Sequence, residues 1–228
     1  MTTTAKTRLD LAPVYRQNKG LTSLVSYPDR CSLWGDARYR GNCDGRLFNE
    51  LVLRYGARSV ADPMMGSGTT RDVIAGLNRF LPEPIEYWGG DLRHGYDLAT
   101  TDLPGRYDFV WIHPPYWNII RYSDDPADLS TIETYPDFRA VLARCLRRCA
   151  AALVPGGRLA VLVGDVRRRG QYTPIVRDVL RLEPDLGELR SVIIKAQHNC
   201  RSDSVGYAAM EDVPIRHEYC VVFKRSKL

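Results

Sequence analysis

The sequence contains no hydrophobic run of the length, about 18 residues, that a membrane-spanning helix needs. Its first residues lack the apolar core of a secretory signal, so we expect a cytoplasmic protein with no membrane partner. The six cysteines form no CxxC pair and no zinc-finger spacing with histidine, which predicts reduced thiols and no metal site. Internal repeats and Gly/Ser linkers are also absent, so no composition shift divides the chain.

The composition is that of an ordinary globular protein. The 228 residues are 44% hydrophobic and 26% charged, which excludes disorder, collagen and coiled coil as descriptions of the whole chain. A chain of this length can bury a sizeable core as one α/β domain. The 32 Lys and Arg against 27 Asp and Glu give a net charge of +5, which permits a polyanionic partner without requiring one.

Apolar runs and helical periods alternate along most of the chain. Residues 1–40 scatter Pro and Gly among aromatic and basic residues, which predicts an N-terminal arm or lid before a single domain over 41–228. Strands are predicted at 59–62, 85–88, 107–112, 159–163, 191–194 and 219–223, and helices from Asp44, after 64–70, between Pro136 and Pro155, and after Pro174. This alternation predicts a mostly parallel sheet with helices on both faces and ligands at the carboxyl ends of the strands.

A Gly-rich turn, ADPMMGSGTT over 61–70, follows the first predicted strand of this series. It is neither a P-loop nor a complete GxGxxG motif, which disfavours a phosphate-cradling site. The carboxylate of Asp62 in front of the glycines would repel a pyrophosphate but attract an amine or a sulfonium. Asp91, at the end of the next strand, can accept hydrogen bonds from both hydroxyls of a ribose. A tight turn without any ligand, and a solvated loop at Asp97, remain the alternatives.

The run HPPYW over 113–117 follows a strand that reads as buried. Its prolines carry no N–H, so the chain cannot continue as a strand and carbonyl groups stay available as acceptors. The Pro114 carbonyl and a neutral His113 ring nitrogen can accept both hydrogens of an amino group, while Tyr116 offers a face to a planar base. Such acceptors favour the pyramidal amine that can attack a methyl sulfonium. A stiff loop without chemistry is the alternative.

In combination, DPMMGSGTT and HPPYW resemble the S-adenosylmethionine-dependent DNA amino-methyltransferases, which make N6-methyladenine or N4-methylcytosine in restriction-modification systems and phages. Weaker matches at 40–42, 164–167 and 217–223 extend the resemblance over about residues 40–225. Met64 stands where the family commonly has Phe, and His113 where it usually has Asp, Asn or Ser. The resemblance therefore leaves open whether adenine or cytosine is the target.

The resemblance implies a Rossmann-like class I methyltransferase fold with a mostly parallel seven-stranded sheet. It implies that the cofactor, S-adenosylmethionine, is bound by Asn42, Asp62, Pro63, Gly66, Gly68, Thr69, Asp91, Asp97 and Leu98. It implies that the catalytic residues are His113, Pro114 and Tyr116. The residues expected to contact the base or the DNA are Pro115, Trp117, Arg167, Arg168 and Arg169, the three arginines because they follow the fifth strand on the ligand side.

The function expected from this resemblance is methylation of an exocyclic amino group in double-stranded DNA. The target base would be flipped into the HPPYW pocket. Because a separate recognition domain does not fit in the chain, target contacts would come from 1–40, 118–135, 197–214 or a second subunit, which makes a homodimer an open possibility. Two alternatives stay open: methylation of RNA or of a protein glutamine, and a catalytically silent DNA-binding relative, which His113 suggests.

Overall fold

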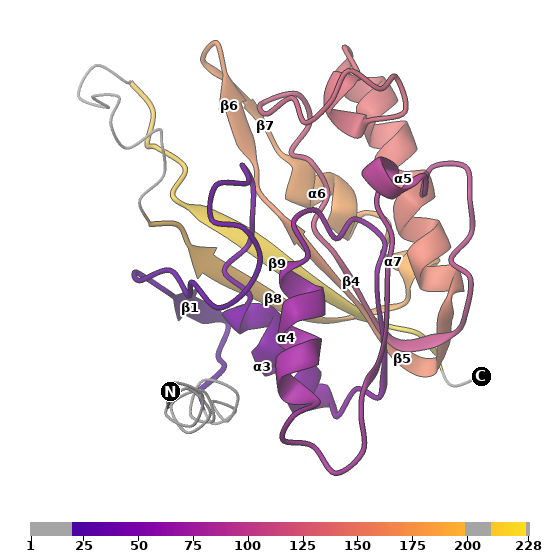
Figure 1. The fold of residues 1–228 in the computed structure, drawn as a ribbon. Coiled ribbons are helices and arrows are strands. Elements are labelled where there is room, and N and C mark those ends of the chain that lie inside the picture. The colour runs from indigo at the N-terminus through magenta and orange to yellow at the C-terminus, as the bar shows by residue number, and fades with distance from the viewer. Residues whose placement is uncertain (1–19, 199–210, 227–228) are drawn as a thin grey trace.

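A seven-stranded sheet with the strand order β1-β8-β9-β5-β4-β2-β3 forms the centre of the computed structural model (Figure 1). The structure describes residues 20–198 and 211–226. Six strands are parallel, and β9 runs antiparallel to its two neighbours. The sheet strands are β1 (Leu24–Ser26), β2 (Ser59–Asp62), β3 (Glu86–Gly89), β4 (Tyr107–Ile112), β5 (Leu153–Val163), β8 (Glu188–Ala196) and β9 (His217–Lys224).

Helices cover both faces of this sheet (Figure 1). Residues of α3 and α4 share one hydrophobic core with one side of the strands, and residues of α5, α6 and α7 share a second core with the other side. A short antiparallel hairpin follows the carboxyl end of β5. These elements are α3 (Arg46–Tyr55), α4 (Thr69–Leu77), α5 (Tyr135–Ala151), β6 (Val166–Arg168), β7 (Gln171–Thr173), α6 (Ile175–Leu180) and α7 (Glu183–Leu186). The observed architecture confirms the fold class expected from the sequence.

The long helix α5 shows how the sequence pattern produces this packing. Phe138, Cys145, Leu146 and Cys149 recur at helical spacing and are fully buried in the core beneath the sheet. The two cysteines therefore pack as small apolar side chains, as predicted. Thr134 caps the helix by accepting a hydrogen bond from the backbone N–H of Asp137.

The chain reverses its direction of travel across the sheet between β2 and β4. From β2 it moves outward to β3, and then crosses back to β4 on the opposite side of β2. The helices that leave two such neighbouring strands diverge, so a crevice opens beyond their carboxyl ends. The Gly-rich turn follows β2 and the HPPYW run follows β4, so this topology brings the two motifs together.

Two expectations about the first fifty residues are wrong. Leu24–Ser26, placed by the sequence in an irregular arm, forms the edge strand β1 and pairs with β8, and Trp34 is 2% exposed in the core beside α3 and α4. Asp44 does not cap the following helix, because Gly45 takes that position in a left-handed conformation. The Asp44 carboxylate accepts hydrogen bonds from the backbone N–H groups of Cys31 and of Arg46, the first residue of α3, and forms an ion pair with the Arg46 side chain. Residues 1–19 of the expected arm lie outside the described residues.

Within the described ranges, 20–198 and 211–226, none of the helices is long and apolar enough to cross a membrane. The same residues place no group of three or more His, Cys, Asp or Glu where it could hold a metal ion. The five cysteines in these ranges are free thiols.

If the segment before residue 40 belongs to the core, truncating Trp34 must destabilise the whole domain. We expect Trp34→Ala to lower the free energy of unfolding by about 3–5 kcal/mol, because it removes a large buried side chain. The neighbouring Leu33 is 45% exposed, so Leu33→Ala is the matched control with a change below about 1 kcal/mol. Urea denaturation followed by far-UV circular dichroism measures both. A Trp34→Ala value equal to the control would mean that the segment is an independent arm.

Candidate active site

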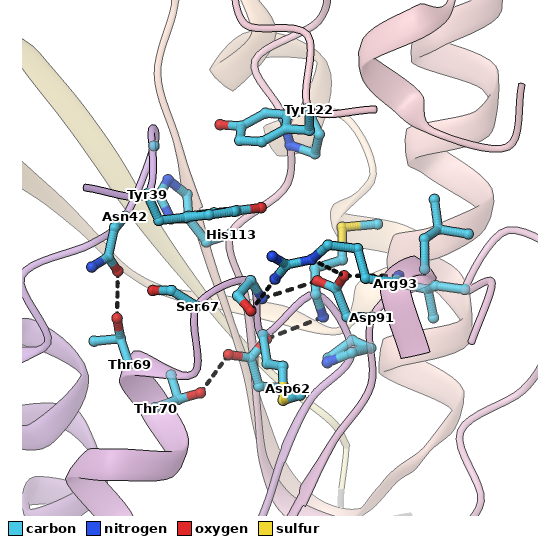
Figure 2. A pocket seen from close by; sticks show the side chains of 18 of the residues that line it. Tyr39, Asn42, Asp62, Ser67, Thr69, Thr70, Asp91, Arg93, His113 and Tyr122 are labelled. Atoms are coloured by element: carbon cyan, nitrogen blue, oxygen red, sulfur yellow. Dashed lines mark hydrogen bonds and ion pairs between the residues drawn. The ribbon is translucent and has the colours of Figure 1, made fainter. Parts of the chain in front are cut away.

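A large cavity opens at the carboxyl ends of β2, β3 and β4 (Figure 2). It encloses about 1000 Å³, including space open to solvent. Three stretches of chain supply most of its wall, namely 39–45, 62–70 and 91–98, and the rest comes from 111–115 and 122–129. The motifs singled out by the sequence therefore line one cavity.

The floor of this cavity is the Gly-rich turn between β2 and α4. Gly66 and Gly68 have φ of +52° and +85°, a left-handed conformation that side chains disfavour. A Cβ at Gly66 would also lie 3.1 Å from the ring of Tyr39. Glycine at this position thus lets the turn and the aromatic ring approach one another across the cavity mouth.

Asp62, the last residue of β2, is a buried carboxylate in the cavity wall, 3% exposed. It accepts hydrogen bonds from the Thr70 hydroxyl at 2.6 Å and from the backbone N–H of Met64 at 3.1 Å (Figure 2). Burial raises its pKa to about 7 in spite of these two donors. A cation beside Asp62 would lower this pKa and stabilise the charged form.

Asp91 follows β3, and its contacts connect the Gly-rich turn with the residues on the opposite side of the cavity. Its carboxylate accepts hydrogen bonds from the backbone N–H groups of Gly66 at 3.0 Å and Arg93 at 3.1 Å, and forms an ion pair with the Arg93 guanidinium. That guanidinium lies over the ring of Tyr39, 4.8 Å from its centre, and Tyr39 stacks on Tyr122 at 5.9 Å. Two aromatic rings and one arginine thus cover the cavity opposite Asp62 (Figure 2).

Negative charge dominates the lining of this cavity. Asp62, Asp91, Asp97 and Asp128 all line it, whereas Arg93 is the only Lys or Arg that the described part of the chain contributes to the lining. Asp97 also holds its own loop, because it accepts hydrogen bonds from the Ala99 N–H and the Thr100 hydroxyl. An acidic cavity of this kind favours a ligand that carries positive charge.

The segment before α3 closes the remaining side of the cavity. The Asn42 side chain donates to the Asp36 carbonyl at 2.8 Å and accepts from the Thr69 hydroxyl, which joins this segment to the start of α4. A Cβ at Gly41, where φ is +77°, would lie 2.0 Å from the hydroxyl of Tyr122. The segment and the loop that carries Tyr122 are therefore in contact only because position 41 has no side chain.

A second, smaller cavity adjoins the first beside the HPPYW loop. It encloses about 570 Å³, again with space open to solvent. Its lining is Gly41, Asn42, Cys43, His113, Tyr116, Ile119, Ile120, Tyr122, Lys195, Gln197 and Glu218. His113 lines both cavities, and Tyr116 lines only the smaller one. His113 thus stands at their junction.

A continuous chain of polar contacts runs from His113 into the sheet. The Nε2 atom of His113 lies 2.9 Å from the Tyr116 hydroxyl, which donates to Glu218 at 2.9 Å. The second oxygen of Glu218 accepts from Lys195 at 2.7 Å. Burial lowers the pKa of His113 to about 4 and raises that of Tyr116 well above its ordinary value. Burial alone would raise the pKa of Glu218, but Lys195, His113 and Tyr116 together lower it to about 2.

Most of the residues singled out by the sequence meet in these two cavities. The larger cavity is lined by Asn42, Asp62, Pro63, Gly66, Thr69, Asp91, Asp97, Leu98, His113 and Pro115. Tyr116 joins them through the smaller cavity. Gly68 and Pro114 are buried and line neither cavity; Gly68 forms the left-handed residue before α4. Their backbone conformations, rather than their contacts, shape the two motifs.

Trp117 and the three consecutive arginines lie outside both cavities. Trp117 donates its indole N–H to the Ile132 carbonyl at 2.9 Å, so it is built into the fold. Arg167 pairs with Asp212, and its side chain is only 17% exposed. Arg168 lies over the Trp117 ring, and Arg169 forms the left-handed turn of the β6–β7 hairpin. Contact of these arginines with DNA stays a prediction, weakest at Arg167 because Asp212 already neutralises it.

Several residues of the site belong to neither of the two sequence motifs. Glu218 and Lys195 come from β9 and β8 at the far side of the sheet, and Tyr39, Arg93 and Tyr122 come from the covering segments. A signal for the first two exists, since Lys195 directly follows the apolar run 192–194 and Glu218 directly precedes the run 219–223. Such a residue is either paired or functional when the strand is buried.

No protein-family model and no curated protein matches this chain. Among solved structures, the presumed DNA modification methylase TTHA0409 of Thermus thermophilus, complexed with S-adenosyl-L-methionine, is 29% identical over 57% of this chain and 51% of its own, with a TM-score of 0.40. TrmN of Thermus thermophilus is 18% identical over 79% and 48%, with a TM-score of 0.48. The N-methyltransferase NodS of Bradyrhizobium japonicum is 10% identical over 79% and 96%, with a TM-score of 0.40.

This chain thus spans about half the length of TTHA0409 and of TrmN. The TM-scores of all three structures lie below 0.5. At that level the similarities do not assign a function to this chain.

The raised pKa of Asp62 means that this carboxylate costs stability at neutral pH. The unfolded chain ionises near pH 4 and the folded one near 7, so stability from this group is present in acid and is lost as the pH rises. Asp62→Asn removes the charge: its amide oxygen can still accept from the Met64 N–H, and its amide N–H can donate to the Thr70 hydroxyl, which has the Tyr87 hydroxyl as a second partner. We expect it to be more stable than the wild type by about 2–4 kcal/mol near pH 8 and by about 1–2 kcal/mol near pH 5, in urea denaturation. A difference that does not grow with pH would contradict the raised pKa.

Proposed function

We propose that this protein transfers a methyl group from S-adenosylmethionine to an exocyclic amino group of adenine or cytosine in DNA. The observation that carries the proposal is the position of His113 at the junction of two cavities. One cavity is large and acidic, and the other is smaller and lies against the HPPYW loop. The residues that line both cavities are Gly41, Asn42, Cys43, His113 and Tyr122, and among them only His113 offers a basic ring nitrogen to a group transferred from one cavity to the other.

The residues of the larger cavity fit S-adenosylmethionine. Four aspartates and one arginine line it, which suits a ligand with a sulfonium and an amino group. We assign Asp62 to the methionine end, because it ends β2 beside the Gly-rich turn, and Asp91 to the ribose, because it closely follows the neighbouring strand β3. When bound, this cofactor supplies an electrophilic methyl group on sulfur.

The residues of the second cavity fit an amino group as the methyl acceptor. A neutral His113 offers a lone pair to one N–H of the amine, and the amine nitrogen forms its new bond to carbon while the carbon–sulfur electron pair stays on sulfur. The proton released from the nitrogen then passes to the His113 ring. A weak base suffices for this step, because an alkylated aromatic amine is acidic.

The burial of His113 changes the pH range expected for this chemistry. An ordinary imidazole, with a pKa of about 6.5, would lose its acceptor lone pair just below neutral pH. Burial lowers the pKa of His113 to about 4, so the ring stays neutral throughout the range in which the protein would work. The loss of activity through protonation of His113 is therefore expected near pH 4.

Positive charge outside the cavities supports DNA as the molecule that presents the acceptor amino group. The β6–β7 hairpin follows β5 at the ligand edge of the sheet and carries Arg168 and Arg169. Arg121, in the loop after HPPYW, is also exposed but pairs with Asp124, so the two hairpin arginines carry most of this argument. Phosphates of a strand that presents a flipped base would pass this rim. The choice between adenine and cytosine, the target sequence and a second subunit stay outside this proposal.

Incubating the purified protein with methyl-labelled S-adenosylmethionine and, separately, DNA, RNA or protein tests the proposed acceptor. We expect label in DNA, and mass spectrometry of the digested DNA to find N6-methyladenine or N4-methylcytosine. His113→Ala is the control for contaminating activity. Label in RNA or in glutamine, with none in DNA, would move the enzyme to another substrate class. Cofactor binding without transfer to any of the three would indicate a silent relative.

A second experiment tests whether the larger cavity binds the cofactor and the smaller one the methyl acceptor. We expect Asp62→Asn, which stays folded, to bind S-adenosylmethionine at least tenfold more weakly, because a charge-assisted contact is lost. Wild-type affinity should fall below about pH 7, where Asp62 takes up a proton, and the variant should lack this dependence. Tyr116→Ala should keep cofactor affinity and lose turnover. Isothermal titration calorimetry and the labelling assay measure these effects; equal loss of affinity in both variants would refute the division.

A further inference from the structure

A buried ion pair lies beneath the catalytic loop and has no role in the chemistry described so far. Lys195 of β8 and Glu218 of β9 are cross-strand partners, with 2.7 Å between Nζ and the carboxylate and with side chains 12% and 11% exposed. Burying two charges costs several kcal/mol per ion before their attraction is counted. Both residues also line the smaller cavity, which places the pair at the expected site of the acceptor.

The protons in this network can be placed one by one. Glu218 is ionised, since its pKa is lowered to about 2, so both of its oxygens only accept hydrogen bonds. Lys195 supplies the proton for one oxygen, and the single hydroxyl proton of Tyr116 must supply the other at 2.9 Å. The Tyr116 oxygen has then no proton left for His113. The 2.9 Å contact between that oxygen and Nε2 requires that Nε2 carries the hydrogen.

We propose that Glu218, held in place by Lys195, is a positioning residue that fixes His113 in the tautomer protonated on Nε2, with Nδ1 left as the acceptor. Its relevance to catalysis rests on the proposed function, but the tautomer itself does not. Glu218 acts through the Tyr116 hydroxyl, so it touches neither the cofactor nor the reacting nitrogen. The order of the chain is Lys195, Glu218, Tyr116 and His113, and every hydrogen bond in it has one donor and one acceptor.

This tautomer selects the class of group that the site accepts. With Nδ1 unprotonated, His113 can receive a hydrogen bond from an N–H but can donate none to a carbonyl or to an aromatic ring nitrogen. An amino group is then favoured over a keto group at the same position of a base. When Nδ1 takes the proton released on methylation, the imidazolium keeps its Nε2–H bond to Tyr116 and stays linked to the negative charge of Glu218.

The charged and titratable groups that face His113 come from several elements. Glu218 from β9 raises its pKa, and Lys195 from β8 lowers it. Cys43, from the segment before α3, and Tyr122, from the loop after HPPYW, line the same cavity, and burial raises the pKa of each to about 11 and about 12, so both are neutral near pH 7. The net field at His113 is therefore set mainly by Lys195 and Glu218, and removing one or the other must shift the pKa of His113 in opposite directions.

Long-range ¹H–¹⁵N NMR of the histidine rings in the whole chain tests this assignment without any methyl transfer. The His113 signals are identified by their absence in His113→Ala. We expect the Nε2–H tautomer alone in the wild type, and signals of the Nδ1–H form as well in Tyr116→Phe and in Glu218→Gln. Lys195→Met should raise the pKa of His113 by about one unit or more, because a nearby positive charge is gone. Glu218→Gln should lower that pKa.

Tyr135→Phe is the matched control. The Tyr135 hydroxyl donates to the buried Asp178 at 2.7 Å, so its loss removes the same kind of bond outside the His113 network, while phenylalanine keeps the ring that packs on Trp117. It should leave the His113 signals unchanged. If Lys195→Met fails to fold because it leaves a buried carboxylate unpaired, the double variant Lys195→Met/Glu218→Gln replaces it, and we expect it to show the Nδ1–H signals.

The outcomes separate this inference from the proposed function. An Nδ1–H tautomer in the wild type, or an unchanged tautomer in both Tyr116→Phe and Glu218→Gln, overturns the positioning role even if the enzyme methylates DNA. The expected signals without any methyl transfer would support the positioning role and count against the proposed function. If the positioning role of Glu218 and the proposed methyl transfer are both correct, Glu218→Gln should lower the turnover number. Its affinity for S-adenosylmethionine should stay that of the wild type.

Discussion

The pairing of β2 with β4 is the constraint on which the site depends. Val60 and Ala61 stand beside Phe109 and Val110 in a parallel register, so the two strands end at the same edge of the sheet. The Gly-rich turn leaves one strand and the HPPYW loop leaves the other. Because both strands are buried in the centre of the sheet, neither motif can move relative to the other without disturbing the core. Rigid placement of two ligands side by side follows from this pairing.

Buried charge accumulates around the site at the expense of stability. Asp62 keeps a carboxylate in a wall where burial raises its pKa to about 7, and Lys195 and Glu218 form an ion pair deep beside the HPPYW loop. A core built for stability alone would place apolar side chains at such positions. These three charged residues all line one of the two cavities, so part of the cost of burying charge falls on the candidate site. The hydrophobic cores on the two faces of the sheet offset this loss of stability.

The sequence predicts the parts of this molecule that depend on local pattern. The spans of β2 and β4, the burial of one face of α5 and the approach of Asp62, Asp91 and His113 all follow from apolar runs, helical spacing and the rule for carboxyl ends of parallel strands. The pairing of β1 with β8 joins segments about 170 residues apart, and no local signal specifies it. The contact of Tyr116 with Glu218 spans 102 residues and depends on the complete strand order. Position in the final sheet, which local pattern does not contain, decides both.

Contacts with Tyr116 and, through it, with Glu218 explain why a histidine suits position 113. A carboxylate there would face Glu218 across the single hydroxyl of Tyr116, and two anions that share one proton donor repel each other. A neutral imidazole avoids this repulsion, because one nitrogen donates to the Tyr116 oxygen while the other remains an acceptor. Residue 113 and the Lys195–Glu218 pair therefore form one electrostatic unit across three strands of the sheet. An acidic residue at position 113 would require a different partner at position 218.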